Sequence, residues 1–229
     1  AVALGADPIL TVKVASHWAA RYFLLNNKGA IAPGYLADFA VLSDLKDFHV
    51  EQVFKRGKCV WDGANVTLTE PKVDPDILQA VENTFHMPEV TADALRTEGE
   101  RPVIGMKPGS IVSESCGLAS GIDAAQDIVK MAVAERHHNT GHLAVCYAKG
   151  YGIRQGAVAT SIAHDSHNLI GCGANDVDLA LAMNRVRAMK GGMAVAKDGK
   201  ILAELPLPLA GLFTDRPLEE VNAKLEACK

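Results

Sequence analysis

Hydrophobic residues recur at helical spacing near the start of the chain. Asp7 and Pro8 are typical of an N-cap followed by proline at the first helical position. Apolar residues then return every three to four positions up to Asn26, which predicts an amphipathic helix of about 18 residues. Gly29 follows as a stop signal that tolerates positive φ. The residues of the predicted apolar face are Ile9, Val12, Ala15, Ala19, Tyr22 and Phe23.

A small group of strands is predicted next, because short apolar runs alternate with turn residues. Residues 29–42 read as a turn that leads into a strand. Residues 50–55 and 58–61 read as a strand pair joined by Arg56 and Gly57. Residues 62–76 are rich in Asp, Gly and Pro and predict a linker.

The remainder of the chain is predicted to be a second unit with more strands than helices. Asn175 and Asp176 predict the cap of a helix with one apolar face, and Asp198-Gly199 predicts a two-residue β-hairpin turn. A last helix is expected over residues 217–227. Strands grouped with few helices, rather than strict alternation, predict an α+β fold. The other predicted strand segments are 103–104, 111–112, 128–134, 143–148, 157–163 and 169–172.

Composition narrows the classes of protein that fit this pattern. The 229 residues are 48% hydrophobic and 22% charged, which suits a globular chain of one or two domains. The net charge of −4 and the lack of a basic run argue against binding to nucleic acid or to an anionic membrane. No apolar run approaches the roughly 18 residues of a membrane span. Five scattered cysteines predict reduced thiols in a cytoplasmic protein.

The position of the first methionine is unusual. It is Met87, well inside the predicted elements. Either the start of the chain is processed or, as the simpler explanation that we expect, the chain is the C-terminal part of a longer protein.

A polar cluster interrupts two predicted strands. Five consecutive polar residues, 164–168, lie between the apolar runs 156–163 and 169–173. Burying such groups without partners would cost roughly 1–3 kcal/mol each, so the cluster is either a solvated turn or a site. A zinc site would need further closely spaced ligands, and a serine hydrolase would need a G-x-S-x-G elbow; neither accompanies the cluster. The residue types alone do not define a reaction.

Residues 29–42 resemble the G-x-I-x-x-G-x-x-A-D-x-x-V-L signature of the amidohydrolase superfamily. The resemblance implies that residues 1–28 are a remnant of a TIM barrel, its last helix, and that residues 29–66 form part of a small β-sandwich. The signature is structural and is shared by deaminases, dihydroorotases, dihydropyrimidinases and imidazolonepropionases. It does not define the substrate.

The second unit resembles a more specific family, the C-terminal domain of adenine deaminases. The resemblance implies that residues 67–229 form an α+β domain with a mixed, mostly antiparallel sheet and flanking helices. The segments that carry it, in order, are Glu135-Arg136-His137, residues 157–168, Asn175-Asp176, Gly191-Gly192 and residues 205–211.

The resemblance implies an enzyme part that hydrolyses adenine to hypoxanthine and ammonia in purine salvage or catabolism. In the family, manganese or iron is bound by barrel ligands, which lie outside this chain, so we expect no metal ligand here and no activity of this chain alone. Adenine, the missing barrel segment of the same polypeptide and further copies in a homo-oligomer are the expected partners. The alternative is a non-catalytic purine-binding or subunit-interaction module.

The resemblance also turns the polar cluster into a candidate site. His164, Asp165 and His167 are the expected catalytic residues. For Glu135, Arg136 and His137, a solvated strand end with adjacent opposite charges is the alternative. The expected substrate-binding residues are Ser166, Asn168, Glu135 and His137.

Overall fold

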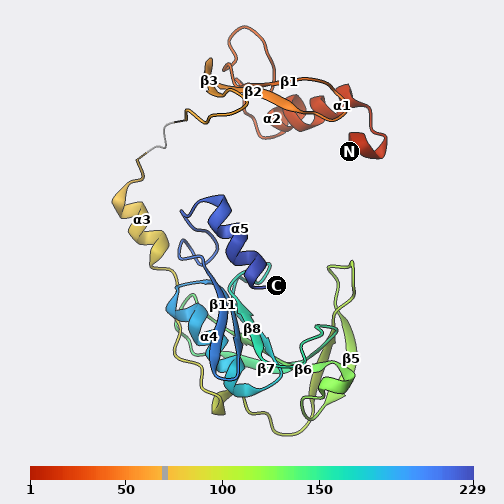
Figure 1. The fold of residues 1–229 in the computed structure, drawn as a ribbon, viewed down its shortest axis with the longest axis vertical. Helices are drawn as coiled ribbons and strands as arrows, with labels where there is room; N and C mark the ends of the chain where they lie inside the picture. Colours follow the sequence, from red (N-terminus) through yellow and green to blue (C-terminus); the bar gives the residue numbers. More distant parts are fainter. Residues whose placement is uncertain (69–71) are drawn as a thin grey trace. The chain divides into compact units, whose positions relative to one another are not determined.

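A computed structural model describes residues 1–68 and 72–229 of the chain. The chain divides into two compact units, Ala1–Lys72 and Val73–Lys229, which we call the N-terminal unit and the C-terminal unit (Figure 1). Among the described residues, no helix combines the length and apolarity that a membrane crossing requires.

The N-terminal unit begins with a helical stretch that includes a π-helical segment. Its elements are a short 3₁₀ turn η1 (Val2–Leu4), α1 (Pro8–Lys13), the π segment η2 (Val14–Trp18) and α2 (Ala19–Tyr22). Asp7 caps α1 as predicted, since its carboxylate accepts from the Leu10 amide at 2.7 Å. The predicted end at Asn26 is wrong by four residues: Leu24 adopts φ +57°, and this left-handed conformation stops the helix.

A three-stranded antiparallel sheet completes the N-terminal unit. Its strands β1 (Phe39–Leu42), β2 (Val50–Lys55) and β3 (Lys58–Trp61) pair in chain order. Arg56 and Gly57 have φ +48° and +77°, values typical of the two-residue hairpin turn that the sequence predicts. Membership of this unit in a barrel or a sandwich stays a prediction.

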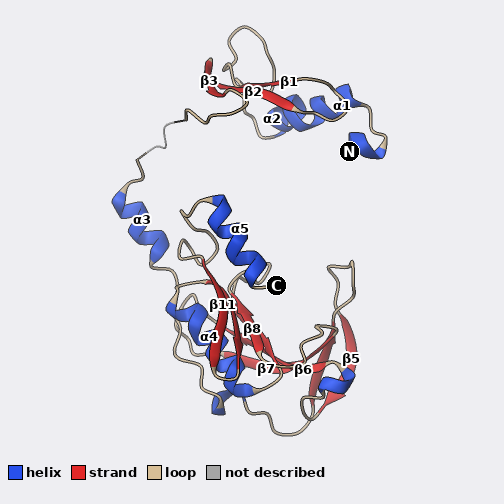
Figure 2. Cartoon of the chain, viewed as in Figure 1, coloured by secondary structure: helices blue, strands red, loops and turns tan. Residues whose placement is uncertain are grey.

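The C-terminal unit is built on one eight-stranded sheet (Figure 2). Its strand order is β11-β10-β8-β9-β6-β7-β4-β5, and every neighbouring pair is antiparallel except β4 with β7. This confirms the predicted mixed α+β architecture. The strands are β4 (Arg101–Gly105), β5 (Glu114–Ala119), β6 (Ile128–Ala134), β7 (Leu143–Lys149), β8 (Ala157–Thr160), β9 (Leu169–Gly173), β10 (Gly192–Lys197) and β11 (Lys200–Pro206).

The main core lies between this sheet and α4 (Asp176–Ala188). Leu179, Met183 and Val186 of α4 are fully buried, so the predicted apolar face is confirmed. A Cβ atom at Gly171 of β9 would lie 2.7 Å from Leu179 Cδ1 and 3.1 Å from Met183 Cγ, so glycine leaves room for these two side chains of α4. The remaining helices are α3 (Pro75–Glu82), the 3₁₀ turns η3 (Asp93–Leu95) and η4 (Ala124–Gln126), and α5 (Leu218–Ala227).

The predicted linker over residues 62–76 extends too far. Helix α3 begins at Pro75 and is capped by Asp74, whose carboxylate accepts from the Asp76 amide at 2.9 Å. A bridge between Trp61 and Val66 also extends the structure past β3. Residues 69–71 of the predicted linker lie outside the described residues.

The predicted strand at Ile111 and Val112 is wrong. Both side chains are exposed in a loop, and the strand of this region is β5, three residues past Ile111. An ion pair of 3.1 Å between Lys107 and Glu114 closes the loop. An apolar pair alone therefore did not define a strand, because the sheet contact was made by the more polar segment that follows it.

Candidate functional site

The polar cluster forms the loop between β8 and β9. The strand β8 ends at Thr160, three residues before the predicted end at Ala163. Within the loop, the His167 amide donates to the Ala163 carbonyl at 2.7 Å. Asp165 and His167 have φ +69° and +49°. Left-handed backbone at residues other than glycine costs on the order of 1–3 kcal/mol and is often found at functional sites.

The side chains of His164 and Asp165 extend into solvent. They are 93% and 91% exposed, and His164 Nδ1 lies 3.0 Å from Asp165 Oδ1. An exposed pair of this kind contributes at most about 1 kcal/mol to stability. The two side chains are therefore accessible to a bound molecule and are not needed for packing.

His167 and Asn168 lie on the inner side of the loop. Among the described residues, His167 Nδ1 and Asn168 Oδ1 are buried atoms without a hydrogen-bond partner. Buried polar atoms in folded proteins are nearly always paired, so two unpaired atoms in adjacent residues call for an explanation.

Arg136, the second residue after β6, holds this loop from inside the protein. The side chain is 1% exposed and stacks over the Phe85 ring at 4.9 Å. Its Nε donates to the His167 carbonyl at 2.7 Å, Nη2 to the Ala210 carbonyl at 3.0 Å and Nη1 to the Thr84 carbonyl at 3.3 Å. Burial lowers the pKa of Arg136, and the charge of Glu135 opposes this effect. The alternative of a solvated strand end is therefore wrong for Arg136.

Ser161 forms a second anchor at the start of the loop. The side chain is fully buried. Its hydroxyl donates to the Gly211 carbonyl at 2.6 Å and accepts from the Gly192 amide at 2.7 Å. Gly211 also packs directly on Arg136, because a Cβ atom there would lie 2.8 Å from Arg136 Nη1. Arg136 and Ser161 thus join the loop to the segment that follows β11.

His137 holds the next carbonyl of the same loop. Its Nε2 lies 3.0 Å from the Ser166 carbonyl oxygen, which can only accept, so Nε2 is the donor. Two consecutive loop carbonyls, those of Ser166 and His167, are therefore bound by two consecutive residues, His137 and Arg136.

Glu135 caps the turn beside this anchor. Its carboxylate accepts from the amides of His137 at 2.5 Å, His138 at 2.8 Å and Thr140 at 3.1 Å, and from the Thr140 hydroxyl at 2.8 Å. Desolvation raises the pKa of Glu135, but these hydrogen bonds outweigh it and lower the pKa to about 2. The substrate-binding role of Glu135 stays a prediction; to bind a ligand, this carboxylate would have to give up bonds of the turn.

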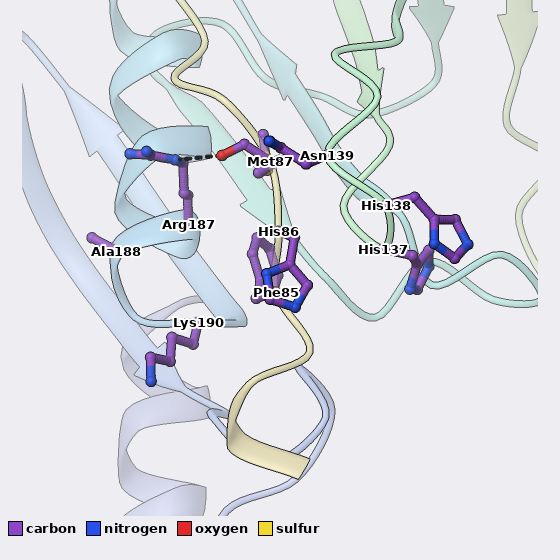
Figure 3. A pocket seen from close by; sticks show the side chains of 9 residues that line it. All are labelled: Phe85, His86, Met87, His137, His138, Asn139, Arg187, Ala188 and Lys190. Atoms are coloured by element: carbon purple, nitrogen blue, oxygen red, sulfur yellow. Dashed lines mark hydrogen bonds between the residues drawn. The ribbon is translucent and has the colours of Figure 1, made fainter. Parts of the chain in front are cut away.

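A surface hollow of about 550 Å³ lies next to the anchor (Figure 3). Of the predicted site residues, only His137 lines it. The described residues, 1–68 and 72–229, contain no group of three or more His, Cys, Asp or Glu that could hold a metal ion. The family resemblance assigns the metal ligands to the barrel, outside this chain, and we derive no chemical step through a metal.

Comparison with known families and proteins agrees with the predicted resemblance. The adenine deaminase C-terminal domain family matches residues 111–229, and the amidohydrolase family matches residues 2–60. Adenine deaminase 2 of Carboxydothermus hydrogenoformans is 39% identical over 99% of this chain and 41% of its own length. The adenine deaminase of Dehalococcoides mccartyi is 38% identical with the same coverage, and that of Halalkalibacterium halodurans is 37% identical over 99% of this chain and 40% of its own length.

The matches cover nearly all of this chain but only part of each relative. The chain spans about two fifths of the length of the curated relatives it matches. The match to the C-terminal domain covers more than half of the chain. The chain therefore belongs to the adenine deaminase C-terminal domain family.

Proposed function

We propose that this chain is the C-terminal part of an adenine deaminase, which hydrolyses adenine to hypoxanthine and ammonia when an amidohydrolase barrel is joined to it. The observation that carries this proposal is the near-complete alignment of the chain with proteins named adenine deaminase. The anchored loop of residues 164–168 supports it, because this loop presents imidazole and carboxylate groups on a buried support.

The reaction adds water to C6 of adenine, breaks the C6–N bond and releases ammonia, so protons must move from the water to the departing nitrogen. We assign contact with the purine and the reacting water to His164, Asp165 and His167. The 3.0 Å pair of His164 and Asp165 suits this role, since a carboxylate can orient an imidazole that accepts and returns a proton. Ser166, Asn168 and His137 hold the ring or the loop, and Glu135 supports the turn beside them.

The metal of the proposed enzyme, manganese or iron, would be bound by residues outside this chain. The described residues offer no metal-binding cluster. The contribution of this chain is instead a set of polar side chains for the substrate.

The exposed apolar side chains of the N-terminal unit are an argument that a barrel is its partner. Among residues 1–68, Ala20 is the only buried residue. Trp18, Tyr22 and Phe23 are 52%, 81% and 69% exposed. Monomeric soluble proteins rarely leave such large apolar groups together in solvent. We propose that the preceding barrel segment of the same polypeptide covers them.

Two further properties are proposed together with this function: a homo-oligomer and a location in the cytoplasm. All five cysteines are free thiols, which is the usual state in a reducing compartment and supports the second of these.

A chimera tests the proposed function. The preceding part of the Carboxydothermus hydrogenoformans relative would be fused to this chain at the position that the alignment defines, and ammonia and hypoxanthine would be measured with adenine as substrate. We expect turnover by the chimera and none by this chain alone. The control is the same barrel part without this chain. A folded chimera that binds adenine but releases no ammonia would instead support the non-catalytic purine-binding module.

A further inference from the structure

The hollow beside the loop anchor shares only His137 with the residues assigned to the proposed deamination. Three segments of the C-terminal unit form it: the stretch after α3, the turn after β6 and the end of α4 (Figure 3). Its volume of about 550 Å³ falls within the range of roughly 300–1,000 Å³ that is usual for small-molecule sites. The lining residues are Phe85, His86, Met87, His137, His138, Asn139, Arg187, Ala188 and Lys190.

The lining is cationic. It contains an arginine, a lysine and three histidines, and no carboxylate. Arg187 Nε donates to the Met87 carbonyl at 2.9 Å, which fixes the guanidinium against the wall of the hollow. Among the described residues, neither Nη atom of Arg187 nor Nζ of Lys190 forms a protein hydrogen bond or ion pair. Three cationic nitrogen atoms therefore remain for a ligand.

The hydrogen-bond acceptors near the hollow, which would repel an anion, already have partners within the protein. The end of α4 would otherwise present free carbonyls, but those of Arg185, Val186 and Arg187 accept from the amides of Met189, Gly191 and Lys190 at 2.9–3.0 Å. Glu135, the carboxylate beneath the His138 turn, is bound by four donors. Two of the histidines already donate within the protein, His86 Nε2 to the Asn83 carbonyl at 2.8 Å and His137 Nε2 to the Ser166 carbonyl at 3.0 Å, so the free donors are those of Arg187 and Lys190.

We propose that this hollow binds a phosphate-bearing small molecule. A phosphate group matches the free donors, because its oxygens accept several charge-assisted hydrogen bonds at once and the arginine fork suits their geometry. The apolar side chains of Phe85, Met87 and Ala188 provide a surface for the organic part of the ligand. A metal ion does not fit, because the described residues hold no ligand cluster for one. This inference does not depend on the deaminase activity.

Binding of three probes to the full 229-residue chain shows whether the hollow prefers free phosphate or a phosphate monoester. Isothermal titration calorimetry would be run at low salt with inorganic phosphate, adenosine 5′-monophosphate and adenosine. We expect both phosphate-bearing probes to bind and adenosine not to bind. Tighter binding of the nucleotide than of phosphate identifies a phosphate monoester site, and equal binding identifies a site for free phosphate. Absence of binding by both, or equal binding of adenosine and the nucleotide, overturns the proposal.

Charge variants locate the site. Lys190→Gln removes a charge whose side chain makes no hydrogen bond among the described residues, so the fold is not disturbed. We expect this variant to raise the dissociation constant of the bound probe by about tenfold, the effect of losing one charge-assisted hydrogen bond. The matched control is Lys200→Gln, which removes the same charge near the opposite end of α4. Lys200 follows Gly199, whose amide donates to the Asp178 carboxylate in the first turn of that helix at 2.9 Å. An equal loss of affinity in both variants would mean non-specific attraction and would overturn the proposal.

Discussion

The two units of this chain differ in what their hydrophobic residues contact. In the C-terminal unit, α4 buries Leu179, Met183 and Val186 completely against the sheet. In the N-terminal unit, the helical stretch from Pro8 to Tyr22 buries only Ala20, and Trp18 is half exposed. Both helices are amphipathic in sequence, but among the described residues only α4 has its apolar face buried by its own unit. Amphipathic spacing thus predicts that a face needs covering, and not which part of the protein covers it.

The largest effect is expected inside the C-terminal unit, at Arg136. Replacing it by Met would leave the carbonyls of His167, Ala210 and Thr84 without their donor. Because each buried unpaired group costs about 1–3 kcal/mol, we expect the free energy of unfolding to fall by about 3 kcal/mol or more. Urea unfolding monitored by circular dichroism measures this. Arg154→Met is the control, since the Arg154 side chain is exposed and, among the described residues, makes one hydrogen bond, to the Ala124 carbonyl. Similar losses in both variants would contradict the role of Arg136 as a buried anchor.

Ser161→Ala should have a smaller effect on the same unit. The variant removes a hydroxyl that bonds both Gly211 and Gly192, and it leaves the Gly192 amide without that partner. We expect a loss of about 1–3 kcal/mol. Ser110→Ala, in an exposed loop, provides a comparison of the same chemistry. Unchanged stability of Ser161→Ala would show that the buried hydroxyl is not needed to hold the loop.

Acid should weaken the C-terminal unit through Glu135. Hydrogen bonds lower the pKa of this group from 4.5 to about 2, so its stabilising contribution is present above pH 4.5 and is lost as the pH falls towards 2. Desolvation raises the pKa of Asp178, but bonds from Asn175, Gly199 and Asp198 outweigh it, so this group acts in the same direction. Glu135→Gln should therefore flatten the dependence of the unfolding midpoint on pH between 4.5 and 2. The exposed Glu98→Gln serves as the control, and an unaltered profile in Glu135→Gln would contradict the assignment.

The smallest change in stability is expected in the N-terminal unit. Trp18 is 52% exposed, so Trp18→Gln should change the free energy of unfolding by no more than about 0.5 kcal/mol. The same variant should reduce self-association of the isolated chain, because it removes exposed apolar surface. Sedimentation velocity against concentration tests this. A strongly destabilised variant would show that Trp18 is part of a core within the chain.

Much of the fold followed from local patterns. The apolar face of α4, the hairpin turn at Asp198-Gly199 and the two strands that flank the polar cluster were predicted and confirmed, although β8 ends at Thr160 and not at the predicted Ala163. The helix α3 was missed although Asp74-Pro75 repeats the Asp7-Pro8 signal that predicted the first helix. The prolines and polar residues around it favoured a linker instead.

The support of the candidate site could not be predicted. Glu135, Arg136 and His137 form a charged triplet in the sequence, which is typical of a solvated strand end. Arg136 is buried because its acceptors come from Thr84, His167 and Ala210, which are distant in the chain and meet only in the folded unit. Local sequence carries no information about such tertiary contacts.

The central proposal is that the loop of residues 164–168 takes part in adenine deamination. Asp165→Asn tests it most directly in the barrel chimera, because Asn tolerates the φ of +69° and removes only the charge. We predict that kcat/KM for adenine falls by roughly tenfold to a thousandfold, the range for a positioned polar or proton-transfer group. The melting temperature should stay unchanged, since the side chain is 91% exposed. Unchanged kcat/KM in both Asp165→Asn and His164→Ala would contradict the claim.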